Sequence, residues 1–199
     1  MNLPRHNIAV FCGSASGSRP AYLEAARALG RGIATRGHGL VYGGATVGLM
    51  GAVAEAALAD GAPVIGVIPD VLAGREIAHR HLTELHAVGT MHERKALMAE
   101  RSHAFLALPG GYGTLDEFFE IVTWAVLKIH ASPCVLINID GYWDPMLAFL
   151  DHVLAEGFLK PETRALVQLA GSVNEALDRV EQHWAAHPHA GLIGDPSVI

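Results

Sequence analysis

Residues 108–120, LPGGYGTLDEFFE, combine two kinds of residue that suit opposite charges. Glycines end an apolar run, at Gly110, Gly111 and Gly113. Glycines before a helix leave backbone N–H groups free, and these groups, with the helix dipole, suit an anion such as phosphate. Three carboxylates then follow in the predicted helix: Asp116, Glu117 and Glu120. Because carboxylates repel an anion, they must either stabilise the helix start or act on another part of a ligand.

Thr114 and Glu117 have the three-residue spacing of a capping box, in which both side chains bond to backbone N–H groups at a helix start. The helix dipole also favours acids in a first turn. Glu117 and Glu120 are three residues apart, so they share a helix face. The residues alone therefore leave two interpretations of Glu117 open, a helix cap and a catalytic carboxylate.

A second group of charged residues lies just upstream, in MHERKALMAERS, residues 91–102. This run is predicted to be helical, with one side formed by Arg94, Met98 and Arg101. A surface helix with internal salt bridges is the structural alternative. Arg94 and Lys95 stand at the start of this helix, and the next strand leads into the glycine loop. Both side chains can therefore lie beside that loop.

Apolar strands alternate with helices around these two groups. The strands are predicted at residues 7–14, 39–44, 62–70, 85–89, 104–111 and 133–140. The helices are predicted at residues 20–37, 47–61, 91–102 and 114–129. Continuous apolar strands between helices are typical of a parallel sheet covered on both faces. We therefore predict an α/β, three-layer Rossmann-like fold with a mostly parallel central sheet and helices on both faces.

The length of 199 residues and the hydrophobic content of 51% fit one globular domain. We predict a single domain over residues 1–186 and a loose C-terminal tail over residues 187–199. The strand at 133–140 is expected to complete the sheet, with a mostly helical chain after it. Residues 71–84 are expected to be irregular.

Three glycine-rich segments fall at the carboxyl ends of predicted strands, at residues 12–18, 42–51 and 109–114. Ligands of parallel sheets bind at this edge, so the segments together predict a shared ligand site. For any one segment alone, a tight turn is an equally good explanation. Ser14 and Gly44 are expected to bring backbone close to a phosphate.

The usual nucleotide fingerprints are absent. The first loop, GSASGS, does not match the dinucleotide pattern G-x-G-x-x-G, and the chain has no G-K-[ST] triplet of a Walker A loop. NAD and ATP in their usual binding modes are therefore disfavoured, and a smaller phosphate ligand remains. The net charge of −6 argues against a nucleic-acid partner.

The composition also bears on the compartment and on metals. No apolar run approaches the roughly 20 residues that span a bilayer. Cys12 and Cys134 both lie in apolar runs, so we expect buried thiols, a reducing compartment and a cytoplasmic protein. His183 and His187 have helical spacing but lack further ligands nearby, so we expect no metal site.

The segment MHERKALMAERSHAFLALPGGYGTLDEFFEIVTWAVLKIH closely resembles the Lonely Guy family, the cytokinin-activating phosphoribohydrolases, whose members were long mislabelled as lysine decarboxylases. The resemblance runs from IAVFCGSASG through YGGATVGLMGAVA and REIAHRHLTEL to INIDGYWDPML, which is most of the chain. The motif P-G-G-x-G-T-x-x-E is specific in combination with the upstream M-H-E-R-K.

The resemblance implies hydrolysis of the N-glycosidic bond of a nucleoside 5′-monophosphate, such as N6-prenylated adenosine monophosphate or AMP, to the free base and ribose 5-phosphate. It places the catalytic pair on Arg94 and Glu117. It also implies a homodimer. We expect no cofactor, and the lack of a long apolar run predicts no membrane partner. The nucleotide-binding positions that the resemblance implies are Glu76, Arg94, Lys95, Gly111, Tyr112, Gly113, Thr114, Leu115, Asp116, Glu117 and Thr123.

Two other functions are compatible with the same residues. A non-catalytic nucleotide-binding module would use the same glycines and Arg94 without needing Glu117 to face the sugar. A pyridoxal-phosphate decarboxylase would need a Schiff-base lysine, and the chain has only Lys95, Lys128 and Lys160. None of the three has local support for that role, so the decarboxylase is the weakest of the three hypotheses.

Overall fold

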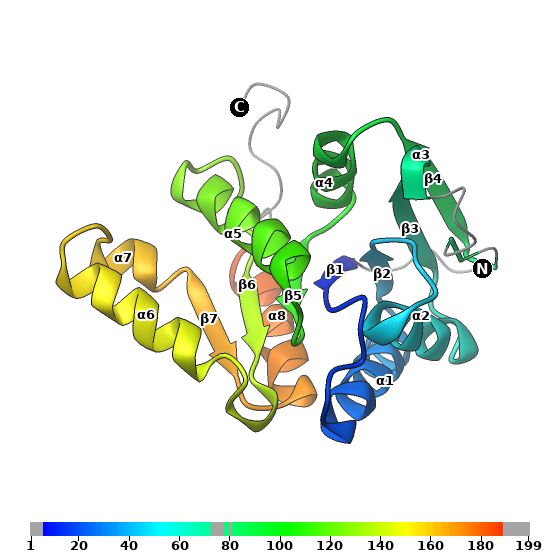
Figure 1. Ribbon diagram of the computed structural model, residues 1–199, viewed down its shortest axis with the longest axis horizontal. Helices are drawn as coiled ribbons and strands as arrows, with labels where there is room; N and C mark the ends of the chain where they lie inside the picture. The colour runs from blue at the N-terminus through cyan, green and yellow to red at the C-terminus, as the bar shows by residue number, and fades with distance from the viewer. Residues whose placement is uncertain (1–5, 73–77, 80, 189–199) are drawn as a thin grey trace.

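The computed structural model describes residues 6–72, 78, 79 and 81–188 of the chain. These residues form a central parallel sheet with helices on both faces (Figure 1). The sheet has seven strands: β1 (Asn7–Phe11), β2 (Gly39–Tyr42), β3 (Val64–Pro69), β4 (Glu84–Val88), β5 (Ala104–Ala107), β6 (Cys134–Ile137) and β7 (Val167–Ala170). Every neighbouring pair of these strands is parallel. The predicted α/β, three-layer class is confirmed.

The helices divide between the two faces of the sheet. One face is covered by α1 (Pro20–Thr35), α2 (Gly48–Ala59) and α8 (Val173–Ala186). The other face is covered by α4 (Met91–Glu100), α5 (Tyr112–Val126) and α6 (Asp144–Ala155). In β1, Ile8 and Val10 pack in the first core, whereas Ala9 and Phe11 pack in the second. Because both faces are buried, the strands appear in the sequence as unbroken apolar runs.

The order of the strands creates a crevice. Across the sheet they run β4-β3-β2-β1-β5-β6-β7, so the chain builds outward from β1 on one side and then crosses to β5. β1 and β5 pair in register, from Ile8 opposite Ala104 to Phe11 opposite Ala107. The loops that leave these two neighbours turn to opposite sides. This is the topological switch point at which α/β sheets bind ligands.

Two side-chain hydrogen bonds fix the start of α4. The Thr90 hydroxyl accepts a hydrogen bond from the Glu93 backbone N–H at 3.1 Å, and the Glu93 carboxylate accepts one from the Gly89 N–H at 2.8 Å. Both bonds satisfy donors that have no partner inside the helix. The first turn, which carries Arg94, is thereby held in place.

The structure corrects the predicted start of α5. The helix begins at Tyr112 with Gly111 as its N-cap, so Thr114 lies inside the first turn and is not a cap. The predicted capping box of Thr114 and Glu117 is therefore wrong. No side chain among the described residues caps this helix start.

The prediction that the strand at 133–140 completes the sheet is also wrong, because β7 pairs beyond β6. β7 has only four residues between α7 (Pro161–Arg164) and α8, and its two central residues are half-buried. The remaining short elements are α3 (Asp70–Leu72) and a 3₁₀ turn, Ile139–Gly141. In the part of the chain that the structure describes, no helix is long and apolar enough to span a bilayer.

The predicted domain boundary coincides with the last residue of α8, Ala186. Of the predicted tail, residues 187 and 188 are described and the rest lies outside the described residues. The tail therefore stays a prediction.

Candidate active site

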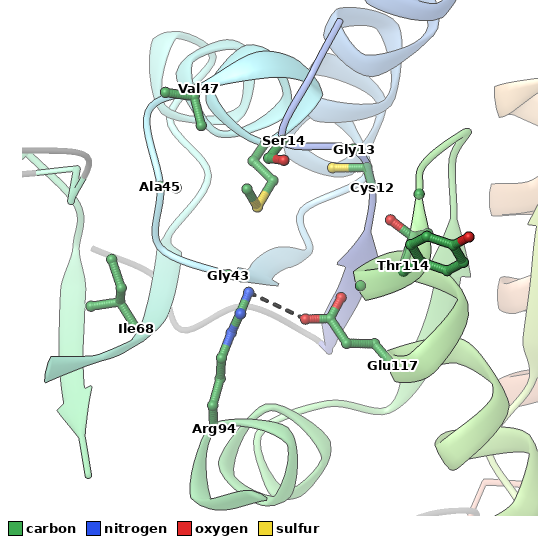
Figure 2. A pocket seen from close by; sticks show the side chains of 14 residues that line it. Cys12, Gly13, Ser14, Gly43, Ala45, Val47, Ile68, Arg94, Thr114 and Glu117 are labelled. Carbon is green, nitrogen blue, oxygen red and sulfur yellow. Dashed lines mark ion pairs between the residues drawn. The ribbon is translucent and has the colours of Figure 1, made fainter. Parts of the chain in front are cut away.

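A cavity of about 370 Å³ opens at the carboxyl edge of the sheet (Figure 2). The three glycine-rich segments meet there, since residues 12–14, four residues of the second segment and residues 111–114 contribute to its walls. Arg94 reaches the cavity from α4, and Glu117 reaches it from α5. The three glycine-rich segments thus meet at one cavity, as predicted, and it lies at the switch point between β1 and β5. That a ligand binds there stays a prediction.

Arg94 and Glu117 form an ion pair inside this cavity. The distance from Arg94 Nη2 to Glu117 Oε1 is 3.2 Å, and each side chain is only 9% exposed. Figure 2 shows the two side chains pointing toward one another from different helices. Because both side chains are buried, the alternative of a surface salt-bridged helix does not hold for Arg94.

Burial raises the pKa of the Glu117 carboxyl, and the neighbouring acids Asp116 and Glu120 act in the same direction. Arg94 and Lys95 lower that pKa and offset part of the effect. The net result is a carboxyl that holds its proton more tightly than an exposed glutamate does. A carboxylate with a raised pKa, held beside a fixed cation, is suited to general-base chemistry near neutral pH.

Arg94 reaches Glu117 because Gly43 has no side chain. A Cβ built on Gly43 would overlap Arg94 Nη2 and would lie 3.1 Å from Arg94 Cζ. The guanidinium thus occupies the space next to the backbone at the end of β2. Its Nη1 lies 3.9 Å from the Met91 sulfur, and its buried Nε has no hydrogen-bond partner among the described residues.

The N-terminus of α5 forms the opposite wall of the cavity. Its first N–H groups have no intrahelical partner, and the helix dipole adds positive potential there. A Cβ on Gly111 or on Gly113 would meet no described atom within 4 Å, so packing within the chain does not require glycine at either position. Open space beside free N–H groups is the arrangement that binds phosphate at helix N-termini.

Lys95, Asp116 and Glu120 form a separate cluster outside the cavity lining. Lys95 Nζ lies 3.1 Å from Asp116 Oδ2 and 3.1 Å from Glu120 Oε2. Burial works against the charge on Lys95, but its hydrogen bonds to Glu120 and Asp116 prevail and raise its pKa. A Schiff-base lysine needs a lowered pKa, so this environment opposes that role.

The structure divides the remaining residues of the predicted site. Those that line the cavity with Arg94 and Glu117 are Ser14, Gly111, Tyr112, Gly113 and Thr114. Those that do not line it are Gly44, Lys95, Leu115, Asp116 and Thr123. The Thr123 hydroxyl donates to the Phe119 carbonyl at 2.7 Å on the exposed face of α5. Glu76 lies outside the described residues.

Six further cavity residues lie within the predicted glycine-rich segments but were not singled out by the sequence: Cys12, Gly13, Gly43, Ala45, Val47 and Met50. Sequence reasoning missed Ile68, which lies near the carboxyl end of β3 and outside all three segments. Burial, with Glu117 nearby, raises the pKa of the Cys12 thiol far above its usual value. Cys12 is therefore a neutral wall of the site and not a thiolate nucleophile.

The fold and the cavity define an α/β protein with a buried carboxylate–guanidinium pair at the switch point of its sheet. A family model described as "Possible lysine decarboxylase" matches residues 50–180. The probable cytokinin riboside 5′-monophosphate phosphoribohydrolase LOGL9 of Oryza sativa subsp. japonica is 50% identical over 176 residues, which cover 88% of this chain and 78% of the relative. The cytokinin riboside 5′-monophosphate phosphoribohydrolase LOG7 of Arabidopsis thaliana is 48% identical over 176 residues, which cover 88% of this chain and 81% of the relative.

This chain belongs to the LOG family of cytokinin riboside 5′-monophosphate phosphoribohydrolases, and the resemblance predicted from the motifs is confirmed. Among solved structures, the Moco carrier protein of Chlamydomonas reinhardtii superposes with a TM-score of 0.70 at 25% identity, covering 91% of this chain and 98% of that one. The same fold therefore also occurs in a protein named as a carrier.

Proposed function

We propose that this chain hydrolyses the N-glycosidic bond of a nucleoside 5′-monophosphate, releasing the free base and ribose 5-phosphate. The observation that carries the proposal is the placement of the Arg94–Glu117 ion pair in the same cavity as the uncapped N-terminus of α5. The relatives that are 45–50% identical and are named as phosphoribohydrolases support it.

The 5′-phosphate binds at the start of α5. The N–H groups around Gly111 and Gly113 and the hydroxyl of Thr114 supply donors, and the helix dipole adds attraction. The rise from Thr114 to Glu117 is roughly 4.5 Å along the helix, which is about the span of a ribose. A nucleotide anchored by its phosphate therefore presents its sugar to Glu117.

Glu117 stabilises the reacting sugar and activates water. As the C1′–N bond breaks, positive charge develops on the ribose ring, and an adjacent carboxylate stabilises it, as in glycoside hydrolysis. The carboxylate accepts a proton from the attacking water, whose oxygen forms the new bond to C1′. The departing base nitrogen takes up a proton in turn. Arg94 keeps Glu117 ionised and oriented for this step, and it also offers hydrogen bonds to ribose or phosphate oxygens.

The base occupies the side of the cavity away from α5. Its wall there is apolar and is formed by Ala45, Val47, Met50 and Ile68. Such a wall suits a flat purine and, beyond it, an apolar substituent on N6. We therefore propose N6-prenylated adenosine monophosphate as the preferred substrate and AMP as a second one. Turnover of the two compounds, compared at equal concentration, checks the preference, and faster cleavage of AMP would contradict it.

We also propose a cytoplasmic homodimer. The free thiols of Cys12 and Cys134 are buried, as in proteins of reducing compartments. The dimer is what the family resemblance implies, and α5 adds no apolar surface for it at Phe118, Ile121 and Trp124, which are buried within the chain itself. Exposed apolar side chains occur elsewhere, at Leu127, Phe149 and Phe158. Light scattering on the eluted protein measures the mass, and a monomer would contradict the dimer.

The reaction is tested by incubating the protein with AMP and separating the products by chromatography. We expect adenine and ribose 5-phosphate in equal amounts. We expect no release of adenine from adenosine, because adenosine lacks the phosphate that anchors the substrate at the start of α5. A non-catalytic nucleotide-binding module would bind AMP without releasing base. That result would favour the non-catalytic module over the hydrolase.

A further inference from the structure

A second cavity of about 290 Å³ adjoins the first. The two share Gly13, Ser14 and Gly111, so the glycine loop before α5 forms a partition between them. Tyr142 lines the second cavity, and its hydroxyl donates a hydrogen bond of 2.6 Å to the backbone carbonyl of Gly110. Tyr142 is not among the described residues that line the first cavity.

This hydrogen bond sets the orientation of a peptide plane. All peptide bonds in the described ranges are trans, so the Gly110 carbonyl and the Gly111 N–H point in opposite directions. Tyr142 holds the carbonyl on the side of the second cavity. The Gly111 N–H therefore points away from the Tyr142 hydroxyl, and Gly111 also lines the first cavity, where the α5 N-terminus lies.

The neighbouring carbonyls of the loop are held in a similar way. The Pro109 carbonyl accepts a hydrogen bond from the Gly13 N–H at 3.1 Å, and the Gly111 carbonyl accepts one from the Leu115 N–H at 3.1 Å. Three consecutive carbonyls are thus engaged, and only the one at Gly110 depends on a side chain. Gly110 packs closely, since a Cβ on it would overlap Thr114 Oγ1 and lie 2.9 Å from the Gly13 nitrogen, whereas Gly111 has open space beside it. The hydrogen bond from Tyr142 therefore adds to the restraint that packing places on the Gly110 side of this peptide plane.

The chain places Tyr142 by an unusual turn. Asp140 has a φ of 52° and Gly141 a φ of 72°, a left-handed pair that reverses the chain after β6. Arg19 Nη1 donates to the Asp140 carbonyl at 3.3 Å, which ties the turn to the start of α1. The Tyr142 ring then makes an edge contact with Tyr22, at a centroid distance of 5.6 Å. A non-glycine residue in the left-handed region persists where its surroundings enforce it, and such residues concentrate at functional sites.

We propose that Tyr142 is a positioning residue for the phosphate: its hydroxyl, through the Gly110 carbonyl, aims the Gly111 N–H at the anion in the first cavity. Tyr142 touches neither the sugar nor the base, so it acts on phosphate affinity and not on bond cleavage. This inference rests on the proposed function for the identity of the anion.

The test compares Tyr142→Phe with Tyr22→Phe, which removes a hydroxyl from the same cavity without touching the Gly110 carbonyl. Calorimetry in a Glu117→Gln background, which we expect to bind AMP with little turnover, measures the binding of AMP and of adenosine to each protein, and product release by the single variants gives KM and kcat for AMP. For Tyr142→Phe we expect AMP to bind about three- to tenfold more weakly, the range expected for one lost neutral hydrogen bond. We expect unchanged adenosine binding, a KM raised by the same factor and a kcat within about twofold of wild type. Tyr22→Phe should match wild type for both ligands.

Two results would overturn the assignment. Unchanged AMP binding in Tyr142→Phe would show that the hydroxyl does not orient the loop. Equal weakening of AMP and adenosine would show a general packing role instead. If the wild-type protein binds AMP but releases no base, the proposed hydrolysis fails while the binding comparison still decides the role of Tyr142.

Discussion

Gly43→Ala tests whether the space beside the end of β2 positions Arg94 for its proposed role. The φ angle of Gly43 lies outside the left-handed region, so alanine can adopt the same backbone conformation. The new methyl group, however, would overlap Arg94 Nη2 and would lie 3.1 Å from Arg94 Cζ and from the Met50 sulfur. Arg94 must therefore withdraw from Glu117.

The size of the effect follows from the burial of the ion pair. Both side chains are 9% exposed, so solvent cannot replace the lost partner of Glu117. Removing one member of a buried pair costs about 3–5 kcal/mol, and displacing it costs less. We expect a loss of about 2 kcal/mol in transition-state stabilisation, which is roughly a 30-fold drop in kcat/KM for AMP.

Steady-state release of adenine from AMP measures the drop, with Gly171→Ala as the matched control. A Cβ on Gly171 would make only an ordinary contact, 3.5 Å from Glu175 Oε2, so kcat/KM should not change. The same Gly43→Ala change is then made in an Arg94→Ala background, where no guanidinium remains to be displaced. There we expect no further loss. An equal loss in both backgrounds, or wild-type activity in Gly43→Ala, would refute the reasoning.

Two more predictions follow from buried groups. Because burial raises the pKa of Glu117 and its ionised form is the active one, kcat/KM should fall with decreasing pH at a midpoint above the roughly 4.3 of an ordinary glutamate. In Arg94→Gln the midpoint should rise further, since Arg94 lowers that pKa; a pH–rate profile with the same or a lower midpoint would contradict this. The buried Tyr42 hydroxyl has no hydrogen-bond partner within the described residues, so Tyr42→Phe should leave the free energy of unfolding unchanged or raise it by up to about 1 kcal/mol. Urea unfolding measures this, and a clear loss of stability would reveal a partner for the hydroxyl.

The sequence predicted the fold class well because the signals are local. Buried parallel strands are continuous apolar runs, and their alternation with helices needs no tertiary information. β7 was missed because VQLA is short and half-buried between helices, so it lacks such a run. The start of α5 was misplaced because a glycine N-cap leaves no side-chain signal in the sequence, whereas Thr114 and Glu117 have the spacing of a capping box.

Residues of the candidate site could be predicted from the sequence only where they belong to a recognisable motif. Arg94 and Glu117 stand in two recognisable segments, and the structure pairs them. Gly43 and Tyr142 contribute from positions that are distant in sequence from these segments or loops. Gly43 leaves space for the Arg94 guanidinium, and the Tyr142 hydroxyl bonds to the Gly110 carbonyl. Such contacts depend on the strand order and on the turn after β6, which no local pattern specifies.

The most direct measurement of the central claim is a comparison of binding and turnover in Glu117→Gln. The amide keeps the shape of the side chain but can neither carry negative charge beside C1′ nor accept a proton from water. We expect AMP to bind within about threefold of wild type, since the phosphate site at the start of α5 is intact, while kcat falls by at least about a hundredfold, as for the loss of a general base. Near-normal release of adenine by Glu117→Gln would contradict the account.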